Sequence, residues 1–171
     1  IKKEDTKAIE VLQEAIRLNG NNDNLYFQLG VVYERQKRFD DAVAAFRKTI
    51  ELNPNHSNAL NYLGYMFAEK GINLKEAEEL IIRALKIRTE DAYFLDSLGW
   101  VYFKMGRFDD AVKYLEQSNR NLPGDPVVSE HLGDAYLKAG YPEKAREYWE
   151  KALKANPEGP SLLNKLKNGL P

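Results

Sequence analysis

Apolar side chains recur three and four positions apart along nearly the whole chain, in successive short stretches. Leu25, Leu29 and Val32 form one such stripe, and Phe46 and Ile50 belong to the next. Because an α-helix turns once in about 3.6 residues, this spacing places the side chains on one face of a helix. The pattern therefore predicts an all-α chain of paired amphipathic helices.

A fixed set of residue types recurs in each pair of predicted helices. The first stretch carries a Leu-Gly pair with an aromatic residue three positions after the glycine: Leu29-Gly30 with Tyr33, Leu63-Gly64 with Phe67, Leu98-Gly99 with Tyr102, and Leu132-Gly133 with Tyr136. The second stretch carries an alanine and, four positions later, a large residue: Ala42 with Phe46, Ala77 with Ile81, Ala111 with Leu115, and Ala145 with Trp149. The glycines lie 34 or 35 residues apart, which indicates a repeat protein.

The small residues and the helix ends have physical reasons of their own. Glycine inside a helix costs about 1 kcal/mol relative to alanine, so four glycines in register indicate that two helices approach closely there. The turn between the two helices is marked by glycine in three pairs and by lysine in one: Gly71, Gly106, Gly140 and Lys37. Proline disfavours helix in the residue before it, and three second helices are followed by one: Pro54, Pro123 and Pro157.

These residues, in this order, resemble the tetratricopeptide repeat over nearly the whole chain. The resemblance implies a right-handed α-α superhelix of about four and a half helical hairpins with a C-terminal capping helix. The expected parts are the second helix of a truncated repeat (1–22), four complete repeats (23–56, 57–91, 92–125 and 126–159), and the capping helix (160–171).

Composition and charge exclude several functions. The formal net charge is −1, with Lys and Glu interspersed, so the sequence does not favour binding to nucleic acid. The apolar runs are shorter than the roughly 18–20 residues of a membrane span, so we expect no direct insertion of this fragment into a membrane. Absence of cysteine excludes disulfides and cysteine-based metal or nucleophile sites, and it leaves the compartment open.

In the family, the first helix of each repeat lines a concave groove, so the inward positions of the first helices are the predicted partner-binding site. These positions are rich in aromatic and amide side chains, which suit a bound peptide. The predicted site consists of Asn24, Phe27, Gln28, Asn58, Asn61, Tyr62, Tyr65, Tyr93, Asp96, Trp100, Phe103, His131 and Asp134. Alternatively, some of these aromatic residues fill gaps between neighbouring repeats. With Asp96, Glu130 and Asp134 facing inward, we expect the C-terminal half of the groove to prefer neutral or basic ligand segments.

Catalysis and cofactor binding have little support in the sequence. His131 is followed three residues later by Asp134 on the same helical face, a spacing that could orient an imidazole as a base. No nucleophile, metal cluster or phosphate-binding loop accompanies this pair. We therefore expect no enzyme activity, no cofactor and no metal site.

A narrower resemblance comes from short sequence stretches around the Leu-Gly pairs, such as Asn61-Tyr62-Leu63-Gly64-Tyr65 and Asp96-Ser97-Leu98-Gly99-Trp100. They are similar to bacterial tetratricopeptide lipoproteins, among them an adaptor of a periplasmic carboxyl-terminal processing protease. This resemblance implies a bacterial source and an adaptor role, and it favours the periplasmic side of the envelope over the cytoplasm.

Two functional hypotheses follow. In the first, the chain is a scaffold that binds a peptide or protein segment in its concave groove, with Tyr62, Tyr65 and Trp100 as the main anchors. In the second, the chain serves assembly through its ends or convex face. The N-terminal helix supports this alternative, because Ile9, Leu12 and Ile16 are expected to lack a covering helix and could form a dimer contact.

Overall fold

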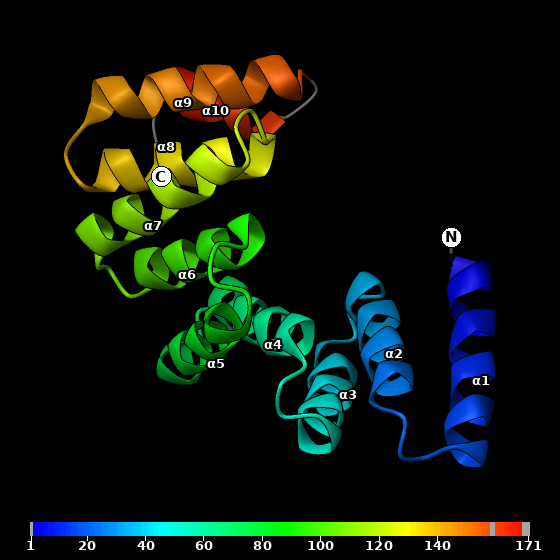
Figure 1. The fold of residues 1–171 in the computed structure, drawn as a ribbon. Coiled ribbons are helices and arrows are strands. Elements are labelled where there is room, and N and C mark those ends of the chain that lie inside the picture. Colours follow the sequence, from blue (N-terminus) through cyan, green and yellow to red (C-terminus); the bar gives the residue numbers. More distant parts are fainter. Residues whose placement is uncertain (1, 158–159, 169–171) are drawn as a thin grey trace. The chain divides into compact units, whose positions relative to one another are not determined.

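The computed structural model describes residues 2–157 and 160–168, and every regular element among them is an α-helix (Figure 1). The helices are α1 (Lys2–Leu18), α2 (Asp23–Arg35), α3 (Phe39–Leu52), α4 (Ser57–Lys70), α5 (Leu74–Ile87), α6 (Ala92–Lys104), α7 (Phe108–Asn121), α8 (Pro126–Lys138), α9 (Pro142–Ala155) and α10 (Pro160–Asn168). The chain divides into two compact units, residues 1–63 and 64–171, with the boundary inside α4; each is described by itself. The predicted all-α fold is confirmed.

The helices that carry the Leu-Gly pair, α2, α4, α6 and α8, are called first helices here, and α3, α5, α7 and α9 are the second helices. All four first helices begin after a residue whose side chain accepts a backbone hydrogen bond: Asn22, His56, Asp91 and Asp125. Such caps satisfy amide groups that have no partner within the helix. The division of the chain into repeats at residues 23, 57, 92 and 126 stays a prediction.

The turns inside the hairpins follow the sequence prediction. Three residues separate α2 from α3, α6 from α7, and α8 from α9, so each pair runs antiparallel. The middle turn residue is left-handed in each case, with φ of 59° at Lys37, 75° at Gly106 and 90° at Gly140. Lysine therefore adopts a conformation that usually favours glycine. The turn between α4 and α5 also has three residues, and two of them are left-handed: Gly71 with φ of 68° and Asn73 with φ of 49°.

The four in-register glycines are where the helices of a hairpin come closest. A Cβ atom added to Gly30 would lie 2.7 Å from Phe46, and one added to Gly99 would lie 2.5 Å from Leu115. The same holds for Gly64 against Ile81, at 2.6 Å, and for Gly133 against Trp149, at 2.5 Å. Each glycine thus faces the large buried residue of the following second helix, so the predicted packing reason for these glycines is confirmed.

The two ends of the described chain differ from the interior. At the C-terminal end α10 packs on α9 and buries Leu162, whereas Leu163 is 54% exposed. At the N-terminal end α1 packs on α2 and buries Ile9, which retains 8% exposure. The expectation that Ile9 lacks cover is therefore wrong, because α2 itself covers it. Leu12 and Ile16 are half-buried.

Candidate partner-binding surface

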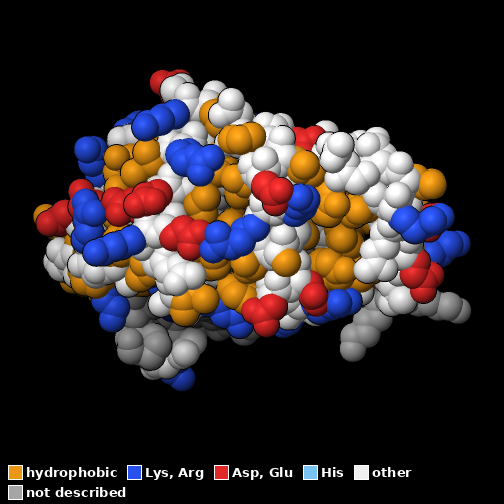
Figure 2. Space-filling model, turned by 90° about the horizontal axis from the view of Figure 1, so that it is seen from below, with side chains coloured by type: hydrophobic (Ala, Val, Ile, Leu, Met, Phe, Trp, Pro, Cys, Tyr) orange, Lys and Arg blue, Asp and Glu red, His pale blue; other side chains and the backbone are white. Residues whose placement is uncertain are grey.

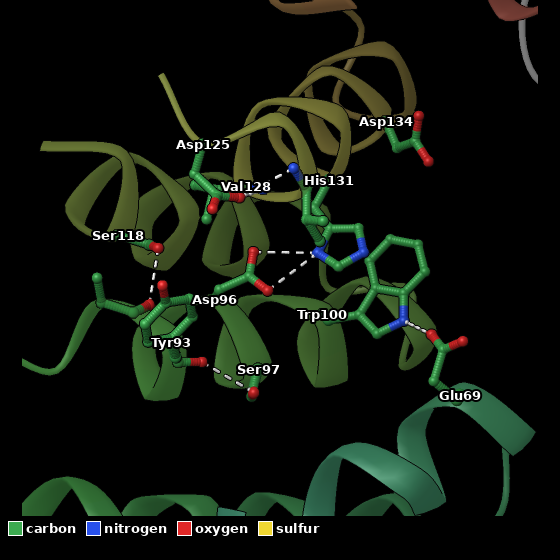
Figure 3. A network of polar contacts seen from close by, with 12 residues as sticks. Glu69, Tyr93, Asp96, Ser97, Trp100, Ser118, Asp125, Val128, His131 and Asp134 are labelled. Atoms are coloured by element: carbon green, nitrogen blue, oxygen red, sulfur yellow. Dashed lines mark hydrogen bonds and ion pairs between the residues drawn. The ribbon is translucent and has the colours of Figure 1, made fainter. Parts of the chain in front are cut away.

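In the unit formed by residues 64–171, the first helices α6 and α8 are joined by a buried pair of polar side chains. His131 of α8 places its Nδ1 atom 3.0 and 3.1 Å from the two carboxylate oxygens of Asp96 on α6. Both residues are buried (Figure 3). Asp134, the partner considered from the sequence, points away from this imidazole (Figure 3). The acid that orients His131 therefore belongs to the neighbouring first helix.

Trp100 continues this network on α6. Its ring stacks on His131, with centroids 4.1 Å apart, and on Phe103, with centroids 4.7 Å apart. Its indole Nε1–H donates to Glu69 Oε1 of α4 at 2.5 Å. Trp100 is 8% exposed, so its ring and its polar edge are already engaged inside the protein.

The environment of His131 shifts its protonation. Burial by itself lowers the pKa of His131, but the charge and hydrogen bond of Asp96 oppose this effect, with further charges from Asp134 and Glu69. The net result is a pKa raised above the ordinary histidine value. The folded state therefore favours the protonated imidazole more than the unfolded state does.

We expect a specific pH dependence of stability from this pair. A folded pKa above the unfolded value of about 6.5 gives stability that is fully present below that pH and is lost as the pH rises through the folded pKa. Urea unfolding at about pH 6 and about pH 9 should show the wild type losing more stability than His131→Gln. An equal loss in both proteins would contradict the assignment.

A second buried polar cluster joins α8 to α10. Lys165 Nζ lies 2.7 Å from Glu130 Oε1 and 2.7 Å from Asp134 Oδ2. Asp134 also accepts a 2.8 Å hydrogen bond from Trp149 Nε1. Burial raises the pKa of Asp134, while Lys165 and Trp149 act in the opposite direction. Lys165 is not among the residues predicted from the sequence. It lies 34 residues after His131, at the equivalent position of the repeat, and this register could have identified it.

In the unit formed by residues 1–63, aromatic side chains occupy the corresponding places. Phe27 of α2 contacts Tyr62 of α4 edge to face, with centroids 5.6 Å apart, and both rings contact Phe46. The imidazole of His56 lies 4.7 Å from the Phe27 ring. Phe27 and Tyr62 are half-buried. These aromatic residues thus form a cluster that joins two first helices.

The thirteen predicted site residues fall into three groups by exposure. Buried side chains are Asp96, Trp100, His131 and Asp134. Half-buried side chains are Phe27, Asn61, Tyr62, Tyr65 and Phe103. Exposed side chains are Asn24, Gln28, Asn58 and Tyr93.

Comparison with known families identifies the repeated unit. Models of the tetratricopeptide repeat match residues 24–56, 45–79 and 102–168, and a model described as a TPR repeat matches residues 1–37.

The chain is built of tetratricopeptide repeats.

Among relatives of this tetratricopeptide chain are two proteins of Pseudomonas aeruginosa. The TPR repeat-containing protein PA4667 is 33% identical over 128 residues, or 75% of this chain. The type IV pilus assembly protein PilF is 29% identical over 139 residues, or 80% of this chain. The chain spans only 22% of the length of the first and 55% of the second.

Solved structures share the tetratricopeptide fold. A MamA crystal structure superposes with a TM-score of 0.74 at 25% identity, covering 99% of this chain and 89% of MamA. In the Cut9–Hcn1 hetero-tetramer of the APC/C, one chain superposes with a TM-score of 0.87 at 22% identity, covering all of this chain and 34% of that one. Tetratricopeptide chains of this kind serve as protein-interaction scaffolds, and that coarse function applies here.

One contact recurs between successive tetratricopeptide first helices. In each first helix the repeated glycine serves as a reference position. The residue two positions before it contacts the residue that lies three positions before the glycine of the preceding helix. Tyr62 meets Phe27 in this way, and His131 meets Asp96. Lys165 of α10 meets Glu130 in the same register. In these three places, inward positions near the repeated glycine hold neighbouring helices together.

Another position of the tetratricopeptide repeat is exposed. Six residues before the glycine, the first helices carry Asn24, Asn58, Tyr93 and Val127, and all four side chains are exposed. Tyr93 and Val127 are large and apolar, with 60% and 52% of their surface exposed. They occupy the same register position on α6 and α8, two helices in contact within one unit.

The described residues contain neither a helix that could span a membrane nor a cluster of metal ligands. None of their helices is long and apolar enough to cross a membrane. No group of three or more His, Cys, Asp or Glu side chains in residues 2–157 and 160–168 is placed to hold a metal ion. On the face drawn in Figure 2, basic and acidic side chains are interspersed with apolar ones.

Proposed function

We propose that this chain binds a segment of a partner protein along the exposed positions of its first helices. The observation that carries the proposal is the exposure of Tyr93 and Val127 at one register position of α6 and α8. Tyrosine offers a rigid apolar ring with a polar edge, and such side chains dominate the energetics of protein interfaces. In the unit formed by residues 1–63, the first helices carry exposed amides: Asn24, Gln28 and Asn58.

The remaining predicted site residues would contribute in two ways. Asp96, Trp100, His131 and Asp134 are buried, so we propose that they fix the spacing of the first helices. The half-buried residues would contact the partner with the part of the side chain that stays accessible: Phe27, Asn61, Tyr62, Tyr65 and Phe103. We therefore propose Tyr93 and Val127 as the leading anchors. They replace the three residues expected from the sequence, which are Tyr62, Tyr65 and Trp100.

The charges near this surface suggest a neutral partner segment. Asp96 is paired with His131, and Asp134 is paired with Lys165. Paired carboxylates exert a weaker field than free ones, because the partner's positive charge offsets them. The preference for basic segments expected from the sequence is therefore weakened, and apolar or amide-rich segments fit best.

A paired capture experiment tests this proposal. Tyr93 and Val127 lie in the first turns of α6 and α8, where the helix dipole favours a negative charge, so Tyr93→Asp/Val127→Asp should remain folded. Wild type and double variant would be compared as baits in lysate of the source organism. We expect a partner retained by the wild type to be lost by the double variant.

The matched control is Leu163→Asp, which introduces the same charge at an exposed apolar residue near the start of α10. It should retain the partner. Equal retention by the double variant, with circular dichroism showing that it is folded, would overturn the proposed site and move the interface elsewhere on the chain.

Self-association is the second candidate function. Val11 and Leu18 of α1 are 61% and 75% exposed, and exposed apolar side chains favour association. Light scattering that shows a dimer, together with its loss in Val11→Asp, would support assembly over partner capture. A monomer at all concentrations tested would exclude it.

We further infer a place in the bacterial cell envelope. The similarity to a type IV pilus assembly protein supports this inference. Adaptor activity toward a carboxyl-terminal processing protease is a separate proposal. It rests on the resemblance of residues 61–65 and 96–100 to bacterial tetratricopeptide lipoproteins. Co-purification of such a protease with the wild type, but not with the Tyr93→Asp/Val127→Asp variant, would support it.

A further inference from the structure

The same contact between neighbouring helices is made by three chemically different pairs of side chains. In the repeat register the pairs are equivalent: Phe27–Tyr62, Asp96–His131 and Glu130–Lys165. The first pair brings two aromatic rings together, with centroids 5.6 Å apart. The second joins an imidazole to a carboxylate at 3.0 Å, and the third joins an ammonium group to a carboxylate at 2.7 Å.

Of these three pairs, the one that contains His131 changes its charge near neutral pH. Histidine titrates between pH 5 and 8, whereas lysine keeps its positive charge over this range and two aromatic rings carry none. Burial lowers the pKa of His131, but Asp96 more than offsets this effect, so the pKa lies above the ordinary histidine value. The contact between α6 and α8 therefore loses its positive charge when the pH rises above neutrality.

Negative charges surround the imidazole from two other helices. Asp96 faces it from α6, and Glu69 of α4 also favours its protonated form. Glu69 accepts a hydrogen bond from Trp100, whose ring stacks on His131 (Figure 3). Lys104 of α6 lies 4.9 Å from the centroid of the Trp100 ring. When His131 loses its proton, the two carboxylates lose the positive charge that offsets their mutual repulsion.

Further groups face this part of α8 from the helices packed against it. On α8 itself Asp134 favours the protonated form of His131. Asp134 in turn binds Lys165 of α10 and Trp149 of α9. Glu116 of α7 accepts a hydrogen bond from a tyrosine of α8. These contacts are made to other residues, so the attraction between α6 and α8 depends chiefly on the charge of His131.

This titratable pair lies one helical turn from the two proposed anchors. On α6, Tyr93 precedes Asp96 by three positions, and on α8, Val127 precedes His131 by four. Residues three or four positions apart lie on the same face of a helix. The separation of α6 and α8 at the titratable pair therefore determines the separation of the anchors.

We propose that the proton on His131 switches the partner-binding surface by setting the separation of Tyr93 and Val127. This proposal rests on the proposed function of these two anchors. With His131 protonated, α6 and α8 are held together and the anchors have the separation that binds the partner segment. With His131 neutral, the helices move apart and partner binding weakens.

Spin-label distances test the switch without a partner. The chain contains no cysteine, so Tyr93→Cys/Val127→Cys introduces two labelling sites at exposed positions. We expect the distance between the labels to increase by about 1–2 Å between about pH 6 and about pH 9, the size of a helix shift at an interface. The control pair Val127→Cys/Leu163→Cys spans α8 and α10, where Lys165 holds the position equivalent to His131. Its distance should stay constant.

Two substitutions of His131 separate its charge from its place in the fold. His131→Lys introduces the residue found at the equivalent position of α10, so it should keep the low-pH distance at both pH values. His131→Gln has no titratable side chain, so its label distance should not change with pH. Circular dichroism at both pH values checks that each protein is folded. A constant distance in the wild-type background, or the same change in all three backgrounds, would overturn the proposal.

A capture experiment separates the switch from the proposed binding site. A partner retained by the wild-type bait at about pH 6 should be retained at least about fivefold less at about pH 9, the lower end of typical coupling between two sites. A His131→Lys bait should retain it equally at both pH values. Equal retention by the wild type would overturn the switch and leave the binding site in place. Retention by Tyr93→Asp/Val127→Asp would overturn the binding site, and the switch with it.

Discussion

Replacing Lys165 by Met is expected to lower the free energy of unfolding by about 3 kcal/mol, the lower end of the range for breaking a buried ion pair. The ammonium group lies 2.7 Å from both Glu130 and Asp134, and the Lys165 side chain is only 13% exposed. Methionine retains most of the packing but leaves two carboxylates without their cation. The lower end applies because the Glu130 side chain keeps 28% exposure to water.

This loss should depend on pH in a defined direction. Burial raises the pKa of Asp134 and Lys165 opposes the rise, so removal of the lysine raises the pKa further. A group with a raised folded pKa contributes more stability at low pH, so the difference between the two proteins should shrink on acidification.

Urea unfolding of both proteins at neutral and acidic pH measures the difference. Adding Asp134→Asn to Lys165→Met should recover part of the loss, because the buried charge is gone. Lys167→Met is the control, since this lysine is exposed on the same helix, and it should change stability little. A loss as small as that of Lys167→Met would show that the buried cluster does not hold α10 in place.

The second large effect is expected at the contact between Gly99 and Leu115. An added Cβ at Gly99 would lie 2.5 Å from Leu115 Cγ. Gly99→Ala should destabilise by about 1–3 kcal/mol through overpacking, despite the better helix propensity of alanine. Leu115→Ala should destabilise by about 2–5 kcal/mol through the cavity it leaves. The double variant should lose less than the sum, by about 1 kcal/mol or more, because the smaller partner leaves room for the added methyl.

A double-mutant cycle by chemical denaturation measures this coupling. The control cycle combines Leu115→Ala with Gly30→Ala, whose added Cβ would meet Phe46 in the other unit, and it should be additive within about 0.5 kcal/mol. Additivity of Gly99→Ala with Leu115→Ala would mean that the glycine is not required by close packing against this leucine.

Much of the fold could be predicted from the sequence because local rules determine it. The period of 34 or 35 residues, the helical spacing of apolar side chains and the turn residues are each readable along the chain. Even Lys37 at a glycine position was identified by register alone, and the structure gives it a φ of 59°. The cover on Ile9 was missed, because a single helix pattern does not show which neighbour packs on which face.

The candidate site was less predictable for the same reason. The register of the repeat predicts which side chains face inward, but it does not predict which of them a ligand can reach. Trp100 and His131 are buried by contacts with Glu69 and Asp96, each more than 30 residues away in sequence. Lys165 lies in a short helix outside the Leu-Gly pattern, so its role was not visible without register alignment. Tyr93 and Val127 are exposed because the adjacent repeats do not cover them, and this depends on the packing between repeats.

Site-specific photocross-linking in cells of the source organism tests the central claim most directly. A photoreactive phenylalanine analogue would replace Tyr93, Val127, Leu163 or Ile87, all of which are exposed. The account predicts a discrete cross-linked partner from positions 93 and 127 and none from position 163 on α10 or position 87 on α5. Cross-links confined to positions 87 or 163 would place the partner elsewhere and contradict binding along the first helices.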